Sequence, residues 1–184
     1  NTITDLPVSF EVFADDADEI ENQAIKIAKW GDNVNVKIPI TNTKGQSLIP
    51  SIRKLSDLGI QLNITALLTL QQVENTTNAL NKETFNIISV FAGRIADTGL
   101  DPKIIMKNSK DIILSKLPKT ELLWASPRQA LNILEAEDVG CDIITITPDL
   151  LNKASNFGKS LDELSLETVK MFFNDAKAAG YTIK

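Results

Sequence analysis

One lysine stands out as a residue that could carry out covalent chemistry. Lys37 lies inside an apolar run, NVNVKIPI, between Val36 and Ile38. Lysine is rarely buried without a reason, and an apolar pocket favours its neutral amine, which condenses with carbonyl groups to form a Schiff base. The protonated imine withdraws electrons and permits cleavage of the adjacent carbon–carbon bond. The alternative interpretation is a lysine at a strand edge whose side chain reaches solvent.

Further polar residues lie in other apolar runs. Glu11, in VSFEVF, is a candidate general acid and base for Lys37, directly or through water, or else its structural ion-pair partner. Asn63 and Thr65, in LNITA, are candidates to orient Lys37, a catalytic water or a substrate hydroxyl. Their alternative role is to satisfy neighbouring backbone groups, as such side chains often do.

A third group of residues is suited to binding a phosphate. Ser89 and Arg94 bracket the segment SVFAGR, and Ser126 lies at the next junction between a strand and a helix. Arginine offers a planar fork for phosphate, and free backbone N–H groups at such junctions attract anions. Together they predict a substrate with a phosphate end, although a lone arginine is more often a surface residue.

The composition excludes several other kinds of function. The 184 residues contain no histidine, so this chain supplies no Ser-His-Asp or Cys-His relay and no His-rich metal site. We therefore expect neither a metal nor a cofactor. A net charge of −5 without a basic cluster argues against nucleic-acid binding. No apolar run approaches the ~20 residues of a membrane helix, and the single cysteine, Cys141, indicates a reducing, cytoplasmic location.

These candidate residues must be positioned by alternating strands and helices. Apolar runs predict strands at 7–13, 33–38, 60–65, 85–91, 120–125 and 141–146. Helical spacing predicts helices at 16–30, 47–58, 69–80, 102–114, 127–135, 148–154 and 161–179.

Residues with strong local preferences mark several ends of these elements. Pro39 is expected to end its strand and Gly59 to stop its helix. Thr69, Ser126 and Ser160 are expected to cap the helices that follow them.

Strict alternation of strands and helices predicts an α/β fold with a parallel sheet. A doubly wound open sheet and a TIM (β/α)8-type barrel both fit. No glycine-rich nucleotide loop follows any strand, which favours the barrel. A barrel has eight strands and typically ~250 residues. We therefore expect one domain, 1–184, that lacks the first two βα units, with its active site at the carboxyl ends of the strands.

Six ordered motifs resemble the transaldolase family, in particular the small bacterial transaldolase and fructose-6-phosphate aldolase-like group. They are VSFEVF, NVKIP, LNITA, SVFAGRIADTG, LLWASPRQAL and GCDIITITPDLL, and they extend over essentially the whole chain. The resemblance implies a (β/α)8 barrel and metal-free Schiff-base chemistry. It also implies transfer of a dihydroxyacetone unit from a ketose phosphate to an aldose phosphate, within the pentose phosphate pathway.

The resemblance also implies roles for individual residues. Lys37 matches the family's Schiff-base lysine, and Glu11 and Thr65 match the pair that holds the catalytic water. The family's first-strand aspartate and its second-strand Thr-Asn-Pro motif have no counterpart in this sequence. That difference leaves open a catalytically silent chain that binds phosphosugars.

The remaining matches concern the substrate. Asn63 and Ser126 match positions that contact substrate, and Ser89 and Arg94 match the phosphate-binding positions. Phe91 matches an aromatic position that is phenylalanine in transaldolases and tyrosine in the related fructose 6-phosphate aldolases. By this resemblance, Glu11 and Phe91 favour transfer over simple cleavage.

The resemblance and the expected free sheet edges also imply association into a homo-oligomer. The helix within 160–179 is the candidate contact, with Val169, Phe172 and Phe173 on its apolar side.

Overall fold

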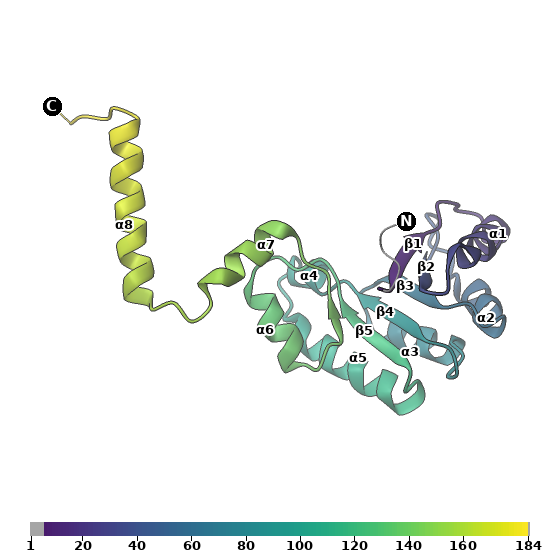
Figure 1. Ribbon diagram of the computed structural model, residues 1–184. Coiled ribbons are helices and arrows are strands. Elements are labelled where there is room, and N and C mark those ends of the chain that lie inside the picture. The colour runs from purple at the N-terminus through teal and green to yellow at the C-terminus, as the bar shows by residue number, and fades with distance from the viewer. Residues whose placement is uncertain (1–5, 184) are drawn as a thin grey trace. The chain divides into compact units, whose positions relative to one another are not determined.

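The computed structural model describes residues 6–183. The chain divides into two compact units, Asn1–Thr147 and Pro148–Lys184. The first unit contains a sheet with helices between its strands (Figure 1). Its strands are β1 (Val8–Glu11), β2 (Val34–Pro39), β3 (Leu62–Leu67), β4 (Asn86–Val90), β5 (Thr120–Trp124) and β6 (Ile143–Ile144). Its helices are α1 (Ala17–Ile27), η1 (Ala28–Trp30), α2 (Ile49–Asp57), α3 (Leu70–Ala79), α4 (Ala92–Ala96), α5 (Pro102–Lys116) and α6 (Leu131–Asp138).

The order of the strands distinguishes the two predicted architectures. All neighbouring strands are parallel and follow the order β1-β2-β3-β4-β5-β6. A doubly wound sheet reverses its order at a switch point, whereas a barrel adds each strand beside the previous one. The sequential order and the curl of the sheet confirm the TIM-type α/β fold (Figure 1). Within residues 6–183 the sheet has six strands.

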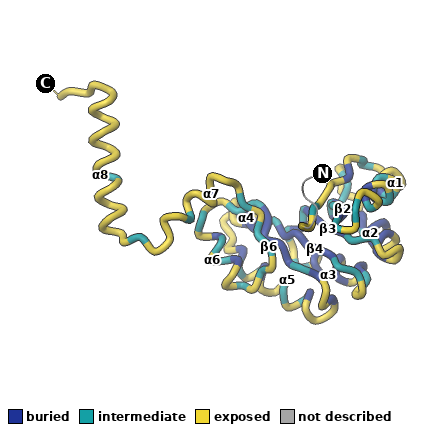
Figure 2. The backbone as a smooth tube through the Cα atoms, viewed as in Figure 1, coloured by how far each residue is buried: buried dark blue, intermediate teal, exposed yellow. Residues whose placement is uncertain are grey.

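The two faces of this sheet have different compositions. Side chains alternate between the faces of a strand. The outer face joins the helices in the main hydrophobic core, which includes Val36, Ile38, Ile64, Ile88, Trp124, Ile52, Val73 and Met106. The inner face has a much smaller apolar cluster around Ile87, Leu123 and Ala125. Buried residues are concentrated along β2, β3, β4 and β5 (Figure 2).

Several predicted boundaries are confirmed. Thr69 and Gln72 form a reciprocal capping box at the start of α3. Gly59 follows α2 with a φ of 78°, in the left-handed conformation that commonly ends helices. Pro102 opens α5 in its first turn, where a missing N–H costs nothing.

The strand ends at Pro39 as predicted, with Pro39 itself as the last residue of β2. The N–H groups of Val36 and Ile40 donate to Gln61, just before β3, and to Thr65 in β3, so alternation directs the Pro39 nitrogen toward β1. β1 already ends at Glu11, level with Lys37, so no ladder hydrogen bond is lost at Pro39.

The predicted cap at Ser126 is wrong. Ser126 has a φ of 59°, and α6 begins later, at Leu131, after a turn. The short helix α4 was not predicted either, since its five residues carry no side-chain cap and too few turns for a periodic pattern.

The second unit consists of α7 (Pro148–Lys153), η2 (Ala154–Asn156) and α8 (Leu161–Ala178). As predicted, the Ser160 side chain accepts a hydrogen bond from the Glu163 N–H, at 3.1 Å, and caps α8. Val169, Phe172 and Phe173 are exposed on this helix. No helix among residues 6–183 is long and apolar enough to cross a bilayer.

Candidate active site

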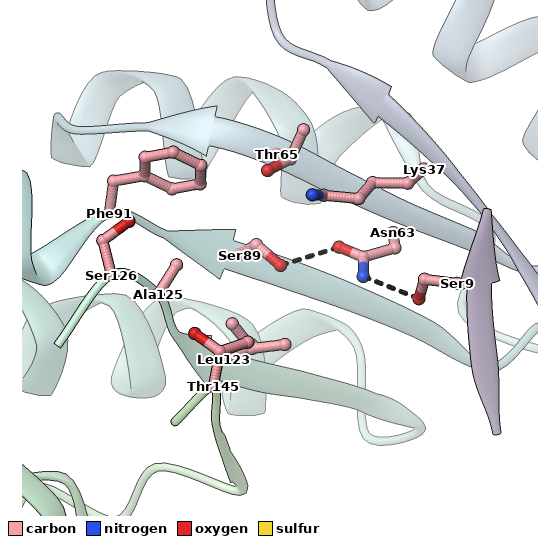
Figure 3. A pocket seen from close by; sticks show the side chains of 10 residues that line it. All are labelled: Ser9, Lys37, Asn63, Thr65, Ser89, Phe91, Leu123, Ala125, Ser126 and Thr145. Carbon is pink, nitrogen blue, oxygen red and sulfur yellow. Dashed lines mark hydrogen bonds between the residues drawn. The ribbon is translucent and has the colours of Figure 1, made fainter. Parts of the chain in front are cut away.

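A cavity of about 300 Å³ opens at the carboxyl end of the sheet (Figure 3). Most of its lining comes from inner-face positions of the strands and from the residues that directly follow them. The lining residues are Ser9, Lys37, Asn63, Thr65, Ser89, Phe91, Leu123, Ala125, Ser126 and Thr145. In a parallel βα fold this is the end at which active sites form.

Lys37 occupies the middle of the lining. It lies in register with Glu11 on β1 and Asn63 on β3, so three polar side chains share one level of the inner face. The Lys37 Nζ is 3.2 Å from Glu11 Oε2, and the lysine side chain is 30% exposed. Figure 3 shows the amine directed into the space that Thr65 borders. Lys37 therefore combines an amine, access from the cavity and a carboxylate within reach.

A hydrogen-bonded chain of side chains crosses the inner face beside Lys37. Ser89 Oγ donates to Asn63 Oδ1 at 2.7 Å, and Asn63 Nδ2 donates to Ser9 Oγ at 2.9 Å (Figure 3). The bonds fix which way the Asn63 amide faces. Ser9 and Asn63 stand on strands that flank β2, so their bond bridges over that strand.

Thr65 and Thr145 contribute hydroxyl-bearing side chains to the lining. Thr65 Oγ1 is buried and has no hydrogen-bond partner among the described residues. The residue after Thr65, Ala66, has a φ of 62°, and the register between β3 and β4 shifts at this point. The backbone irregularity therefore coincides with the cavity end of β3.

The far end of the cavity is formed by Phe91 and Ser126. Arg94 lies on α4, and its guanidinium is 5.7 Å from the centroid of the Phe91 ring. Arg94 itself is exposed and is not among the lining residues. Its stacking position, beside a residue that does line the cavity, places it at the rim.

Two contacts hold the turn that carries Ser126 against α4. A Cβ built on Gly93 would lie 1.5 Å from the Ser126 carbonyl oxygen, so only glycine fits there. Arg128 donates from Nε to both carboxylate oxygens of Asp97, at 3.0 and 3.1 Å, and from its Nη2 to Oδ2. These hydrogen bonds from Arg128 hold the pKa of Asp97 below its usual range.

The structure brings together most of the residues that the sequence predicted. Lys37, Asn63, Thr65, Ser89, Phe91 and Ser126 line one cavity. Glu11 reaches it through its ion pair with Lys37, and Arg94 through its contact with Phe91.

Sequence reasoning did not select Ser9, Leu123 or Ala125 for the site. The available signal for Ser9 and Leu123 was parity, because each lies two residues from a predicted site position or strand end on the same face.

Metal-binding side chains do not gather anywhere in the described range. Among residues 6–183, no group of three or more Cys, Asp or Glu side chains is placed to hold an ion.

The fold and site define an α/β barrel-type protein with an amine-bearing cavity at the strand ends. The chain belongs to the transaldolase/fructose-6-phosphate aldolase family, whose model matches residues 1–183.

Named relatives agree with this family. A probable transaldolase 2 of Listeria monocytogenes is 35% identical over 152 residues, which cover 83% of this chain and 66% of the relative. The chain thus spans a little under two thirds of that protein's length. A probable transaldolase of Thermoplasma volcanium is 34% identical over 177 residues, covering 95% of this chain and 76% of the relative.

Among solved structures, one titled "Native KDPGal structure" is 13% identical and aligns with a TM-score of 0.30 over 98% of each chain.

Proposed function

We propose that this protein is a transaldolase that uses Lys37 to transfer a dihydroxyacetone unit from a ketose phosphate to an aldose phosphate. The observation that carries the proposal is the Lys37 amine, directed into a cavity of about 300 Å³ and 3.2 Å from the Glu11 carboxylate. The family includes transaldolases and aldolases, and the relatives named above are probable transaldolases.

The reaction begins when the neutral Lys37 amine adds to the ketone carbon of a substrate such as fructose 6-phosphate. The carbinolamine loses water to give a protonated imine, and the Glu11 carboxylate moves protons during this step, directly or through a water held with Thr65. The Glu11 carboxylate, directly or through the same water, then accepts the proton of the C4 hydroxyl, so that the C3–C4 bond breaks and glyceraldehyde 3-phosphate leaves as the aldehyde. The electron pair of that bond moves into the imine, and the dihydroxyacetone unit remains bound to Lys37 as an enamine.

The second half of the reaction reverses these steps on another aldehyde. The enamine carbon attacks the carbonyl of an aldose phosphate such as erythrose 4-phosphate and forms a new carbon–carbon bond. Water then hydrolyses the imine and frees Lys37. In both halves Asn63 contacts substrate hydroxyls. Its hydrogen bonds with Ser89 and Ser9 hold the amide in one orientation for that contact.

The phosphate end of the substrate binds at the other end of the cavity. Ser126 supplies a hydroxyl there and Arg94, at the rim beside Phe91, supplies a fork of positive charge. Ser89 is committed to Asn63, so it supports the site through that bond.

Trapping with borohydride tests this function. Incubation with fructose 6-phosphate and borohydride is expected to leave a dihydroxyacetone unit on the peptide that contains Lys37, read by peptide mass spectrometry. Lys37→Met should abolish the adduct. Lys110→Met is the matched control, because Lys110 is also paired with a carboxylate, that of Asp142, but lies outside the cavity. An adduct on another lysine, or turnover by Lys37→Met, would refute the assignment.

Two alternatives make different predictions in the same assays. A fructose 6-phosphate aldolase would release free dihydroxyacetone without an acceptor aldehyde, and the phenylalanine at position 91 argues against it. A silent phosphosugar-binding chain would bind fructose 6-phosphate without any trapped adduct. Within residues 6–183, β1 and β6 are the edge strands of the sheet.

We also propose a cytoplasmic role in the pentose phosphate pathway and self-association through α8. The exposed Val169, Phe172 and Phe173 are the apolar residues available for that contact. Sedimentation velocity is expected to give a species larger than a monomer, and Phe172→Glu to dissociate it. A wild-type chain that sediments as a monomer contradicts this part of the proposal.

A further inference from the structure

Ser126 has a backbone conformation that its own residue type does not favour. Its φ of 59° lies in the left-handed region, which costs a residue with a Cβ roughly 1 kcal/mol or more. Such a conformation persists only where the surroundings hold it in place. Because Ser126 lines the cavity, whatever holds its backbone also determines where its hydroxyl points.

Part of the support comes from α4. The Gly93 N–H donates to the Ala125 carbonyl at 3.2 Å, and the missing Cβ of Gly93 lets the Ser126 carbonyl lie directly against the helix backbone. No side chain separates the two segments at this point. The turn after β5 therefore rests on the same short helix that carries Arg94.

The other part of the support is the two-pronged ion pair between the Arg128 guanidinium and the Asp97 carboxylate. Arg128 lies two residues after Ser126, and Asp97 is the C-cap residue that follows α4. Each side chain is about half exposed, at 47% and 50%. An ion pair that is this exposed contributes little to stability, yet a two-pronged arginine–carboxylate contact fixes orientation well. Asn132 Oδ1 stabilises the same turn by accepting hydrogen bonds from the backbone N–H groups of Arg128 and Gln129.

We propose that Arg128 and Asp97 are positioning residues which hold Ser126 and Arg94 at a fixed separation and so give the site its specificity for substrates with a phosphate end. This inference rests on the proposed function, because it deepens the role given to Ser126 and Arg94. Arg128 acts through the backbone of its turn, and Asp97 acts through the end of α4. Neither touches the substrate.

The test compares phosphorylated and unphosphorylated ligands on the full chain. Arg128→Lys keeps the charge but loses the fork, and Asp97→Asn keeps the shape but loses the charge. Each is expected to lower kcat/KM for fructose 6-phosphate about tenfold, mainly through KM, because a displaced Ser126 or Arg94 loses about one charge-assisted hydrogen bond to the phosphate. Borohydride trapping of unphosphorylated dihydroxyacetone on Lys37 should remain at the wild-type rate.

A matched control comes from another exposed ion pair. Glu83 and Lys119 pair at 3.2 Å with side chains 68% and 55% exposed, and neither lines the cavity. Glu83→Gln is expected to change neither measurement. The double variant of Asp97 and Arg128 should lose no more than either single variant, because both changes break one contact.

Calorimetric binding of fructose 6-phosphate separates failure of this inference from failure of the proposed function. If the wild type binds the sugar without turnover, the transaldolase assignment fails, and weaker binding by Arg128→Lys still supports the positioning role. The positioning role is overturned if both variants lose affinity equally for phosphorylated and unphosphorylated ligands. It is also overturned if the affinity of both variants is unchanged.

Discussion

Replacing Asn35 with valine should make this protein more stable. Asn35 is on the inner face of β2, two residues before Lys37, and is 1% exposed. Neither its Oδ1 nor its Nδ2 has a hydrogen-bond partner in the described part of the chain. A buried polar group without a partner costs about 1–3 kcal/mol relative to its solvated state in the unfolded chain. Asn35→Val removes that cost and adds a β-branched residue that suits a strand.

The size of the effect follows from these figures. A gain near the middle of that range, about 2 kcal/mol, corresponds to a rise in Tm of roughly 4–8 °C for a chain of this size. Urea denaturation followed by circular dichroism should show a higher midpoint with an unchanged slope, since the surface exposed on unfolding is the same.

Thr120→Val is the control for Asn35→Val. Thr120 is also buried and its Oγ1 also has no partner among residues 6–183, but it lies on the outer face, away from the cavity. It should give a smaller gain, because only one polar atom is removed instead of two. A lower midpoint for Asn35→Val would refute the reasoning, since it would mean that the amide makes favourable interactions in the folded protein.

Three further predictions concern single groups. Burial, and then the neighbouring Asp142, raise the pKa of Glu121 above its ordinary 4.5. Ionisation of Glu121 therefore disfavours the folded state. The free energy of unfolding falls as the pH rises from about 4.5 through the raised pKa. Glu121→Gln should thus raise the urea midpoint at neutral pH and leave it unchanged at about pH 4. An equal effect at both pH values would contradict this cause. Burial raises the pKa of the Cys141 thiol to about 12, so iodoacetamide should modify it only in denaturant, and rapid modification of the native protein would exclude such burial. Arg94→Ala should raise KM for fructose 6-phosphate about tenfold or more with little change in trapping of dihydroxyacetone, and an unchanged KM would remove Arg94 from the phosphate site.

The elements with strong local signals could be predicted from the sequence. Helix α3 shows this well, because Thr69 and Gln72 form its cap from residues three apart. The strand order also followed, since strict alternation with short connections leaves few parallel topologies. The sequence placed Lys37, Asn63 and Ser89 in strands, and parallel strands bring their carboxyl ends to one edge.

Features that depend on contacts between distant segments could not be predicted. The left-handed backbone of Ser126 depends on its contact with Gly93, a residue on another βα unit. The hydrogen bond between Ser9 and Asn63 passes over β2, so it forms only if the sheet curls enough to bring β1 and β3 together on the inner face. Sequence periodicity reports which face a side chain takes, but it carries no information on curvature.

The two-faced sheet has a consequence for how this protein can change. Along β2, Val36 and Ile38 belong to the hydrophobic core while Lys37 faces the cavity. Adjacent residues in the sequence therefore contribute separately to folding and to the site. A library that varies only the cavity-facing positions of the strands would explore new substrates while most of the folding energy stays untouched. A library restricted to the helix-facing positions would explore heat tolerance and leave the reaction alone.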